Sequence, residues 1–184
     1  MGRLLDIITP LHKKSARDYV GRMADDKIRC SEVARQYGFD YWDGERKYGY
    51  GGYKYEGRWA AVAKALVAGY SLKKDAKILD VGCGKGYLLY ELKRLLPDAV
   101  AVGIDISDYA LQEAKPEIRS SLRKLPAQDP YPFADREFDL VFSNTTLHNL
   151  TMADLEKALR EIERVGKNKF VCVESFRSVA ELFN

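Results

Sequence analysis

The stretch ILDVGCGKGYLLYEL, residues 78–92, joins a short apolar run to a leucine-rich segment through three closely spaced glycines. The apolar run KILDVG, residues 77–82, predicts a buried strand. The helix predicted to follow is ended by Pro97 and carries four leucines at helical spacing, which are Leu88, Leu92, Leu95 and Leu96. Glycine is required where the backbone turns sharply or where a ligand approaches without an intervening Cβ. The stretch therefore predicts a strand, a ligand-binding turn and a helix in direct succession.

Strand and helix patterns alternate on both sides of this stretch. A helix within 59–70 is predicted from apolar residues at helical spacing, which are Trp59, Val62, Ala63, Leu66 and Tyr70. Ser107 is a predicted N-cap, and Thr151 with Asp154 resembles a capping box that opens a helix carrying Met152, Leu155, Leu159 and Ile162. Further strands are predicted over 99–106, 138–143 and 169–175, with a weaker one within 121–127. This alternation implies an α/β, doubly wound, Rossmann-like fold, with a mostly parallel sheet and helices on both faces.

The first 56 residues differ in composition from the rest of the chain. Half of the 12 tyrosines lie between Tyr37 and Tyr55, interspersed with glycines. We therefore expect a helical, Tyr/Gly-rich N-terminal cap over 1–56 and a Rossmann-like domain over 57–184. Because about nine residues follow the last predicted strand, that strand is expected at an uncovered edge. Either the chain is part of a longer protein, or another subunit of a homo-oligomer covers this edge.

Composition and charge limit the classes of partner. The 30 Lys and Arg residues against 27 Asp and Glu residues give a net charge of +3 with both signs interleaved, so neither a nucleic-acid nor a membrane partner is expected. No run approaches the roughly 20 apolar residues of a membrane span. Three widely separated cysteines, Cys30, Cys83 and Cys172, are typical of reduced thiols, and no metal site is expected. The protein is expected to be cytoplasmic.

The glycine spacing disfavours two common phosphate-binding loops. A dinucleotide loop, Gly-x-Gly-x-x-Gly, would need its third glycine where Tyr87 stands. The Gly-Lys-Ser/Thr loop of nucleoside triphosphatases is absent because Lys85 is followed by Gly86. An acidic residue, Asp80, also lies two positions before the first glycine.

The Asp-x-Gly-x-Gly-x-Gly run, the acid Asp105 and the FDLVFSN strand resemble class I S-adenosylmethionine-dependent methyltransferases in order and spacing over residues 57–175. The resemblance implies that S-adenosylmethionine is the cofactor, with Asp80 holding its amino group. Asp105 would bind the two ribose hydroxyls, since the two oxygens of a carboxylate can each accept a hydrogen bond, and Ile106 would lie against adenine. The implied cofactor-binding residues are Asp80, Gly82, Gly84, Gly86, Asp105, Ile106, Ala127, Gln128 and Asn144.

The chain departs from the family's pattern at two places. Residues 125–128 read Leu-Pro-Ala-Gln where the family often has Gly-Asp-Ala, so only a backbone contact near Ala127 or a contact from Gln128 is carried over. The family's last two strands have no counterpart in the chain.

The segment SNTTLHNL, residues 143–150, follows the fourth predicted strand and is expected beside the glycine loop. His148 could be the general base for an alcohol acceptor, and the alternative is that it packs against or caps the next helix. Glu174 is a weaker candidate. Asn144 is followed by two threonines rather than the Pro-Pro-aromatic segment of enzymes that methylate exocyclic amines of bases, which disfavours nucleic acid as substrate.

The tract KYGYGGYKYEGRW, residues 47–59, together with the glycine loop, resembles a bacterial group of methyltransferases associated with surface-polysaccharide biosynthesis. The resemblance implies a small acceptor, namely a hydroxyl of a sugar or of a phosphorylated metabolite. Tyrosine rings suit stacking on sugars, and the candidate substrate-binding residues are Tyr48, Tyr50, Tyr53, Tyr55 and Arg58. Three alternatives stay open: a tyrosine tract packed only for stability, a protein or RNA methyltransferase, and a non-catalytic module that binds S-adenosylmethionine.

Overall fold

The computed structural model describes residue 5, residues 7–8 and residues 25–173. These residues belong to two compact units, of which the first ends at Tyr55 and the second begins at Glu56. The part of the expected N-terminal cap that spans 9–24 and the candidate Glu174 lie outside the described residues.

The first unit contains two short helices, α3 (Lys27–Ala34) and α4 (Phe39–Trp42), followed by the Tyr/Gly tract. Trp42 is buried, and its ring stacks on the Tyr50 ring with centroids 5.2 Å apart and an interplanar angle of 7°. The Tyr53 ring packs on both of these rings. A Cβ on Gly49 would lie 2.2 Å from the Tyr41 carbonyl oxygen, so only glycine allows this close return of the chain. The tract thus forms a small aromatic core within its own unit.

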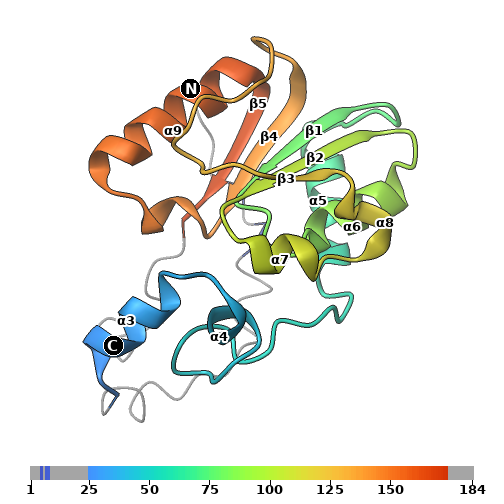
Figure 1. Cartoon of the computed structure of the whole chain (residues 1–184). Coiled ribbons are helices and arrows are strands. Elements are labelled where there is room, and N and C mark those ends of the chain that lie inside the picture. Colours follow the sequence, from blue (N-terminus) through green and yellow to red (C-terminus); the bar gives the residue numbers. More distant parts are fainter. Residues whose placement is uncertain (1–4, 6, 9–24, 174–184) are drawn as a thin grey trace. The chain divides into compact units, whose positions relative to one another are not determined.

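The second unit alternates strands and helices (Figure 1). Its helices are α5 (Trp59–Tyr70), α6 (Tyr87–Leu95), α7 (Asp108–Gln112), α8 (Pro116–Arg119), the 3-10 helix η1 (Leu147–Asn149) and α9 (Met152–Val165). Its strands are β1 (Lys77–Val81), β2 (Val100–Asp105), β3 (Leu122–Lys124), β4 (Phe138–Asn144) and β5 (Gly166–Cys172). Every described pair of neighbouring strands is parallel, in the order β3-β2-β1-β4-β5. The predicted α/β, Rossmann-like fold is confirmed.

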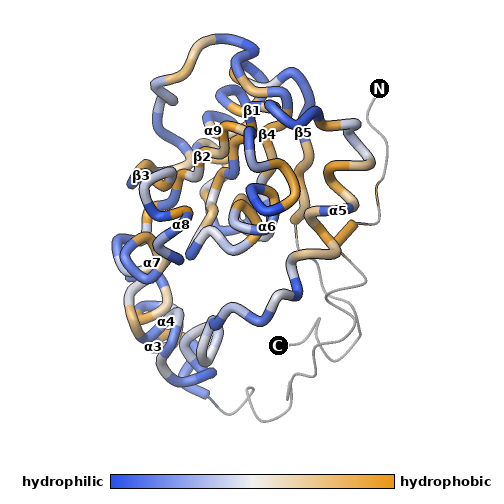
Figure 2. Tube along the Cα trace, turned by 90° about the vertical axis from the view of Figure 1, so that its right-hand side faces the viewer, coloured by the Kyte–Doolittle hydropathy of each residue, from blue (hydrophilic) through white to orange (hydrophobic). Residues whose placement is uncertain are grey.

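Helices cover both faces of the sheet, with α9 on one face and α5 and α6 on the other (Figure 1). Alternate residues of β1 divide between these layers. Leu79 and Val81 join the cluster that contains Ile162 and Val165 of α9. Figure 2 shows that hydrophobic residues concentrate along the central strands, as expected for a parallel sheet buried on both faces.

Strand order reverses between β1, the central strand of the sheet, and its neighbour β4. Asp80 lies opposite Gly103 of β2 and Phe142 of β4 in the strand register. The carboxyl ends of the three strands therefore lie at one edge of the sheet, and the crevice outside such a reversal is where open α/β sheets bind ligands.

The structure refines several predicted boundaries. Strand β5 begins at Gly166, three residues before its predicted start, and it is an edge strand of the described sheet. Thr151 caps α9 by accepting a hydrogen bond from the Asp154 N–H at 3.2 Å. Two residues of the apolar pattern on α9, Met152 and Leu159, are 83% and 42% exposed. The helix instead buries Ala158, Ile162 and Val165 against the sheet.

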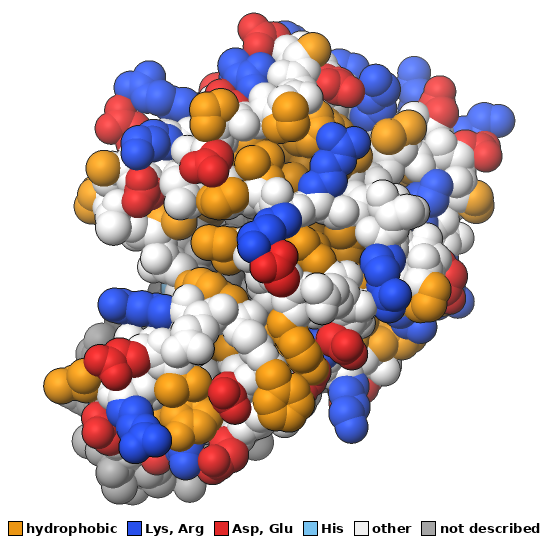
Figure 3. Space-filling view, viewed as in Figure 1, with side chains coloured by type: hydrophobic (Ala, Val, Ile, Leu, Met, Phe, Trp, Pro, Cys, Tyr) orange, Lys and Arg blue, Asp and Glu red, His pale blue; other side chains and the backbone are white. Residues whose placement is uncertain are grey.

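Surface features agree with the interleaved charges of the sequence. On the face of the second unit seen in Figure 3, acidic and basic side chains alternate rather than separate into areas of one sign. None of the helices in the described part of the chain is long and apolar enough to cross a membrane. Within the described part of the chain, Cys30, Cys83 and Cys172 form no disulfide.

Candidate functional site

The glycine loop between β1 and α6 depends on backbone conformations that side chains disfavour. Its three glycines have φ between 54° and 81°, and they are Gly82, Gly84 and Gly86. A Cβ on Gly82 would lie 2.0 Å from the Thr146 Oγ1 atom, so the loop passes directly against the segment that follows β4. Such a turn leaves backbone groups accessible to a ligand.

Asp105, the last residue of β2, is fixed by two backbone donors. Its Oδ2 atom accepts from the Gly84 N–H at 2.7 Å, and its Oδ1 atom accepts from the Ser107 N–H at 2.8 Å. Burial raises the pKa of the Asp105 carboxyl, and these N–H groups oppose the rise. Each oxygen can still accept a hydrogen bond from a hydroxyl group, which suits a pair of neighbouring hydroxyls. Ile106, which follows directly, is 47% exposed.

Asp80 is a buried carboxyl group at the end of β1. It is 4% exposed, and its side chain accepts no hydrogen bond from any residue that the structure describes. Burial and the nearby charge of Asp105 raise the pKa of Asp80 well above its ordinary value. Burying a carboxylate without a donor is costly. An ammonium group on a bound molecule would supply both the opposite charge and the missing donors.

A second unmatched polar group lies at the end of β4. The Asn144 Oδ1 atom is buried and accepts no hydrogen bond within the described residues. The two threonines that follow are fixed by backbone contacts. The Thr145 N–H donates to the Cys172 carbonyl at 2.8 Å, and the Thr146 hydroxyl donates to the Gly82 carbonyl at 3.3 Å. A buried acceptor without a donor next to the glycine loop favours a bound molecule that supplies one.

The turn after β3 is the third part of this edge. The Leu125 N–H donates to the Asp105 carbonyl at 3.0 Å. This bond fixes the turn beside Asp105, the residue predicted to bind the ribose. Ala127 is buried, and its carbonyl accepts from the Tyr131 hydroxyl at 2.9 Å. The amide N–H groups of Ala127 and Gln128 donate to no other described residue. Two unused donors beside Asp105 and Ile106 suit the edge of a purine ring.

These residues fit the cofactor that the sequence implied. Asp80 offers a carboxyl for an amino group, the loop offers a glycine-lined approach, and Asp105 offers two acceptor oxygens. The predicted residues that the fold gathers at this edge are Asp80, Gly82, Gly84, Gly86, Asp105, Ile106, Ala127, Gln128 and Asn144.

The candidate base and the candidate acceptor residues come from different parts of the chain. His148 is exposed in η1, and its neighbour Leu147 is buried in the core. Its role as a base stays a prediction. The predicted acceptor residues Tyr48, Tyr50, Tyr53 and Tyr55 belong to the first unit, whereas Arg58 belongs to the second. The structure therefore does not bring these five residues together within one unit.

Sequence reasoning missed several residues around the site. Lys85 is 3% exposed, with its Nζ atom 5.6 Å from the centre of the Tyr109 ring. Tyr131 lies in a loop for which no function was predicted, and it is held there by Glu161 and Arg164 of α9. An aromatic residue inside a polar, proline-rich loop was the one local signal of this burial.

Comparisons with known proteins agree with the site. A family model described as a methyltransferase domain matches residues 72–184. The chain is 37% identical over 111 residues to a demethylmenaquinone methyltransferase of Roseiflexus sp. (strain RS-1), a match that covers 59% of this chain and 44% of that protein. It is 39% identical over 93 residues to a malonyl-[acyl-carrier protein] O-methyltransferase of Legionella pneumophila, which covers 48% of this chain and 32% of that protein. The matches thus span less than half the length of either relative.

A solved structure shows the same fold. It is described as an S-adenosyl-L-methionine-dependent methyltransferase from Methanococcus maripaludis, and it aligns with a TM-score of 0.53 at 18% identity over 86% of this chain and 64% of that one. The family match extends over more than half of the sequence and includes the glycine loop, Asp105 and Asn144. The chain therefore belongs to the methyltransferase domain family and carries a class I S-adenosylmethionine-dependent methyltransferase domain.

Proposed function

We propose that this protein transfers a methyl group from S-adenosylmethionine to a small acceptor, at a hydroxyl of a sugar or of a phosphorylated metabolite. The observation that carries the cofactor assignment is the pair of unmatched buried groups, the Asp80 carboxyl and the Asn144 Oδ1 atom, at the edge where the strand order reverses. The name of the Legionella relative, an O-methyltransferase, supports oxygen as the acceptor atom.

Bound S-adenosylmethionine would supply an electrophilic methyl group on its sulfonium. The residues of this chain would orient it: Asp80 at the amino group, Asp105 at the ribose, and the turn containing Ala127 at the adenine. Alignment of an attacking oxygen in such a displacement contributes up to about 7–11 kcal/mol. A hydroxyl acceptor must also lose its proton, and we assign that step to the imidazole of His148.

The tyrosine tract supports recognition of a sugar-like acceptor. Tyr50 and Tyr53 pack on Trp42, and Tyr48 and Tyr55 are partly buried. We assign acceptor stacking to Tyr48 and Tyr55, whose rings keep an accessible part, with Arg58 binding an anionic group. A place in surface-polysaccharide biosynthesis, in the cytoplasm, is part of this proposal.

The test is a survey of acceptors with S-adenosylmethionine labelled at the methyl group. Nucleotide sugars and phosphorylated metabolites are expected to gain label, with peptides and RNA as comparison acceptors. Label transfer to peptide or RNA alone would overturn the assigned acceptor class. Transfer to no acceptor by a protein that binds the cofactor would favour a non-catalytic binding module.

The same assay tests the base. His148→Ala should lower kcat by roughly 100-fold, because a positioned base contributes at least that much, while the Kd for S-adenosylhomocysteine stays unchanged. His148→Gln keeps a polar side chain and serves as the control. Normal turnover in His148→Gln would show that proton removal is not the role of this residue.

A further inference from the structure

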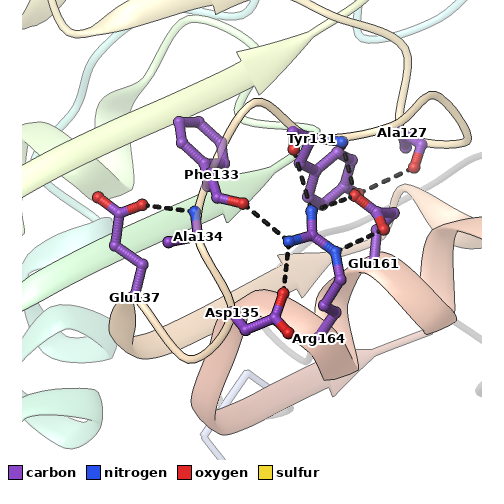
Figure 4. A network of polar contacts seen from close by, with 8 residues as sticks. All are labelled: Ala127, Tyr131, Phe133, Ala134, Asp135, Glu137, Glu161 and Arg164. Atoms are coloured by element: carbon purple, nitrogen blue, oxygen red, sulfur yellow. Dashed lines mark hydrogen bonds and ion pairs between the residues drawn. The ribbon is translucent and has the colours of Figure 1, made fainter.

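The loop between β3 and β4 is held by the carboxyl-terminal part of α9 (Figure 4). Arg164 is the centre of this contact, and all five N–H donors of its guanidinium are used. They reach Glu161 Oε1 at 2.8 Å, Glu161 Oε2 at 2.7 Å, Asp135 Oδ1 at 2.9 Å, the Phe133 carbonyl at 2.8 Å and the Tyr131 carbonyl at 3.0 Å. A saturated, planar guanidinium fixes its partners in direction as well as distance.

Tyr131 is fixed at three of its groups. Its carbonyl accepts from Arg164, and its N–H donates to the Glu161 Oε2 atom at 2.6 Å. Its side chain is 4% exposed, and its hydroxyl donates to the Ala127 carbonyl at 2.9 Å. Burial raises the pKa of the Tyr131 hydroxyl, and the Arg164 hydrogen bond lowers the pKa of Glu161. At neutral pH the hydroxyl therefore stays a donor and the carboxylate stays an acceptor.

This chain of contacts ends at the turn that carries the two unused amide donors. The turn is tied to β2 by the bond from the Leu125 N–H to the Asp105 carbonyl, and to α9 through Tyr131. The second connection is the one that reaches Ala127 itself. Without the Tyr131 hydroxyl, the Ala127 carbonyl would lose its one hydrogen bond within the described chain.

We propose that Glu161, Arg164 and Tyr131 are positioning residues for the adenine end of the cofactor, because they hold the Ala127–Gln128 turn in the conformation that presents its free amide groups. This role rests on the proposed contact between that turn and adenine. The residues act through the turn and do not touch the cofactor themselves.

The test compares the affinity of two ligands by calorimetry: S-adenosylhomocysteine and S-inosylhomocysteine, in which hypoxanthine replaces adenine. An N–H donor pairs with the N1 acceptor of adenine but opposes the N1–H group of hypoxanthine, so the wild-type protein should prefer adenine. Tyr131→Phe removes only the hydroxyl. It should weaken the binding of S-adenosylhomocysteine about three- to tenfold, which is the effect of one neutral hydrogen bond. It should also reduce the ratio between the affinities for S-adenosylhomocysteine and S-inosylhomocysteine.

Arg164→Lys, which leaves three donors in place of five, should have the same effect. The matched control is Arg160→Lys on the same helix, because Arg160 forms a similar pair with Glu156 at an exposed position. The Arg160→Lys variant should bind both ligands with the affinity of the wild-type protein.

Equal weakening of both ligands in Tyr131→Phe and Arg164→Lys would show a structural effect only and overturn the positioning role. Unchanged affinities in both folded variants would also overturn it. A folded wild-type protein that binds neither ligand would refute the proposed cofactor site itself, and the positioning role with it.

Discussion

Asp80 and Asp105 are two carboxyl groups of the candidate site, and they differ in the hydrogen bonds that they accept. Asp105 receives backbone N–H donors on both oxygens, whereas Asp80 receives none from the described residues. Both could be named as candidates from the sequence, because their positions follow from the glycine spacing and from the end of a strand. The raised pKa of Asp80 could not, since it depends on burial and on Asp105, which lies on a different strand.

The raised pKa of Asp80 predicts how stability depends on pH. Because this pKa is higher in the folded than in the unfolded chain, Asp80 favours folding most below its ordinary pKa, and this contribution is lost as pH rises through the raised value. Asp80→Asn should therefore stabilise the cofactor-free protein by about 1–2 kcal/mol at neutral and higher pH, and it should weaken S-adenosylmethionine. Thermal denaturation across pH checks this. A variant less stable than wild type at every pH would contradict it.

The glycine loop predicts a steric effect at one position. Gly82→Ala adds a Cβ at φ 81°, where it would lie 2.0 Å from Thr146 Oγ1, so the loop must move. We expect a loss of about 1–3 kcal/mol in stability and at least tenfold weaker binding of S-adenosylhomocysteine. Gly69→Ala is the control, because a Cβ there meets nothing within 4 Å. Gly82→Ala with normal binding would mean that the loop does not contact the cofactor.

Elements with local sequence signals were the ones that could be predicted. The strand at 77–81 and the helix at 59–70 follow from apolar spacing, and the caps at Ser107 and Thr151 from side-chain chemistry. The contact through which α9 holds the β3–β4 loop was not predicted, because Arg164 and Tyr131 lie 33 positions apart in sequence. Nothing local indicates that a surface helix will hold a distant loop.

The two helix caps predict different functional effects. Thr151 caps α9, whereas Ser107 caps α7 and also donates its N–H to Asp105. Replacing either residue with alanine should cost about 0.5–2 kcal/mol of stability. Ser107→Ala keeps the N–H that donates to Asp105 but removes the Oγ cap, which loosens the start of α7 around that N–H. It should therefore also weaken the binding of S-adenosylhomocysteine, while Thr151→Ala should leave this affinity unchanged. Equal affinities in the two variants would contradict this account of Asp105.

At the scale of the molecule, the chain consists of two units with different cores. The parallel sheet carries the candidate cofactor-binding residues, and the aromatic group around Trp42 organises the tyrosine tract within the first unit. That packing was one of the alternatives for the tract, and it accounts for Tyr50 and Tyr53, whereas a role in acceptor binding is proposed for Tyr48 and Tyr55. The sequence could not separate these roles, because ring packing depends on contacts that no local pattern encodes.

Because the tyrosine tract and the candidate cofactor site belong to different units, we expect tyrosine substitutions to change acceptor binding without changing cofactor binding. Tyr48→Ala and Tyr55→Ala should raise KM for the acceptor about three- to tenfold through lost stacking, with the Kd for S-adenosylhomocysteine unchanged. Phe39→Ala removes an exposed aromatic ring from the same unit and is the control. An unchanged acceptor KM in both tyrosine variants would show that the tract has a structural role and does not bind the acceptor.

The most direct test of the central claim is a calorimetric titration of the folded protein with S-adenosylmethionine. We expect one molecule to bind per chain, and Asp105→Ala to weaken binding at least tenfold through loss of the ribose contacts. The control is Asp98→Ala, because Asp98 is an exposed acidic residue shortly before β2. This variant should bind S-adenosylmethionine like the wild-type protein. Absence of binding by the folded wild-type protein, or equal binding by Asp105→Ala, would contradict the account.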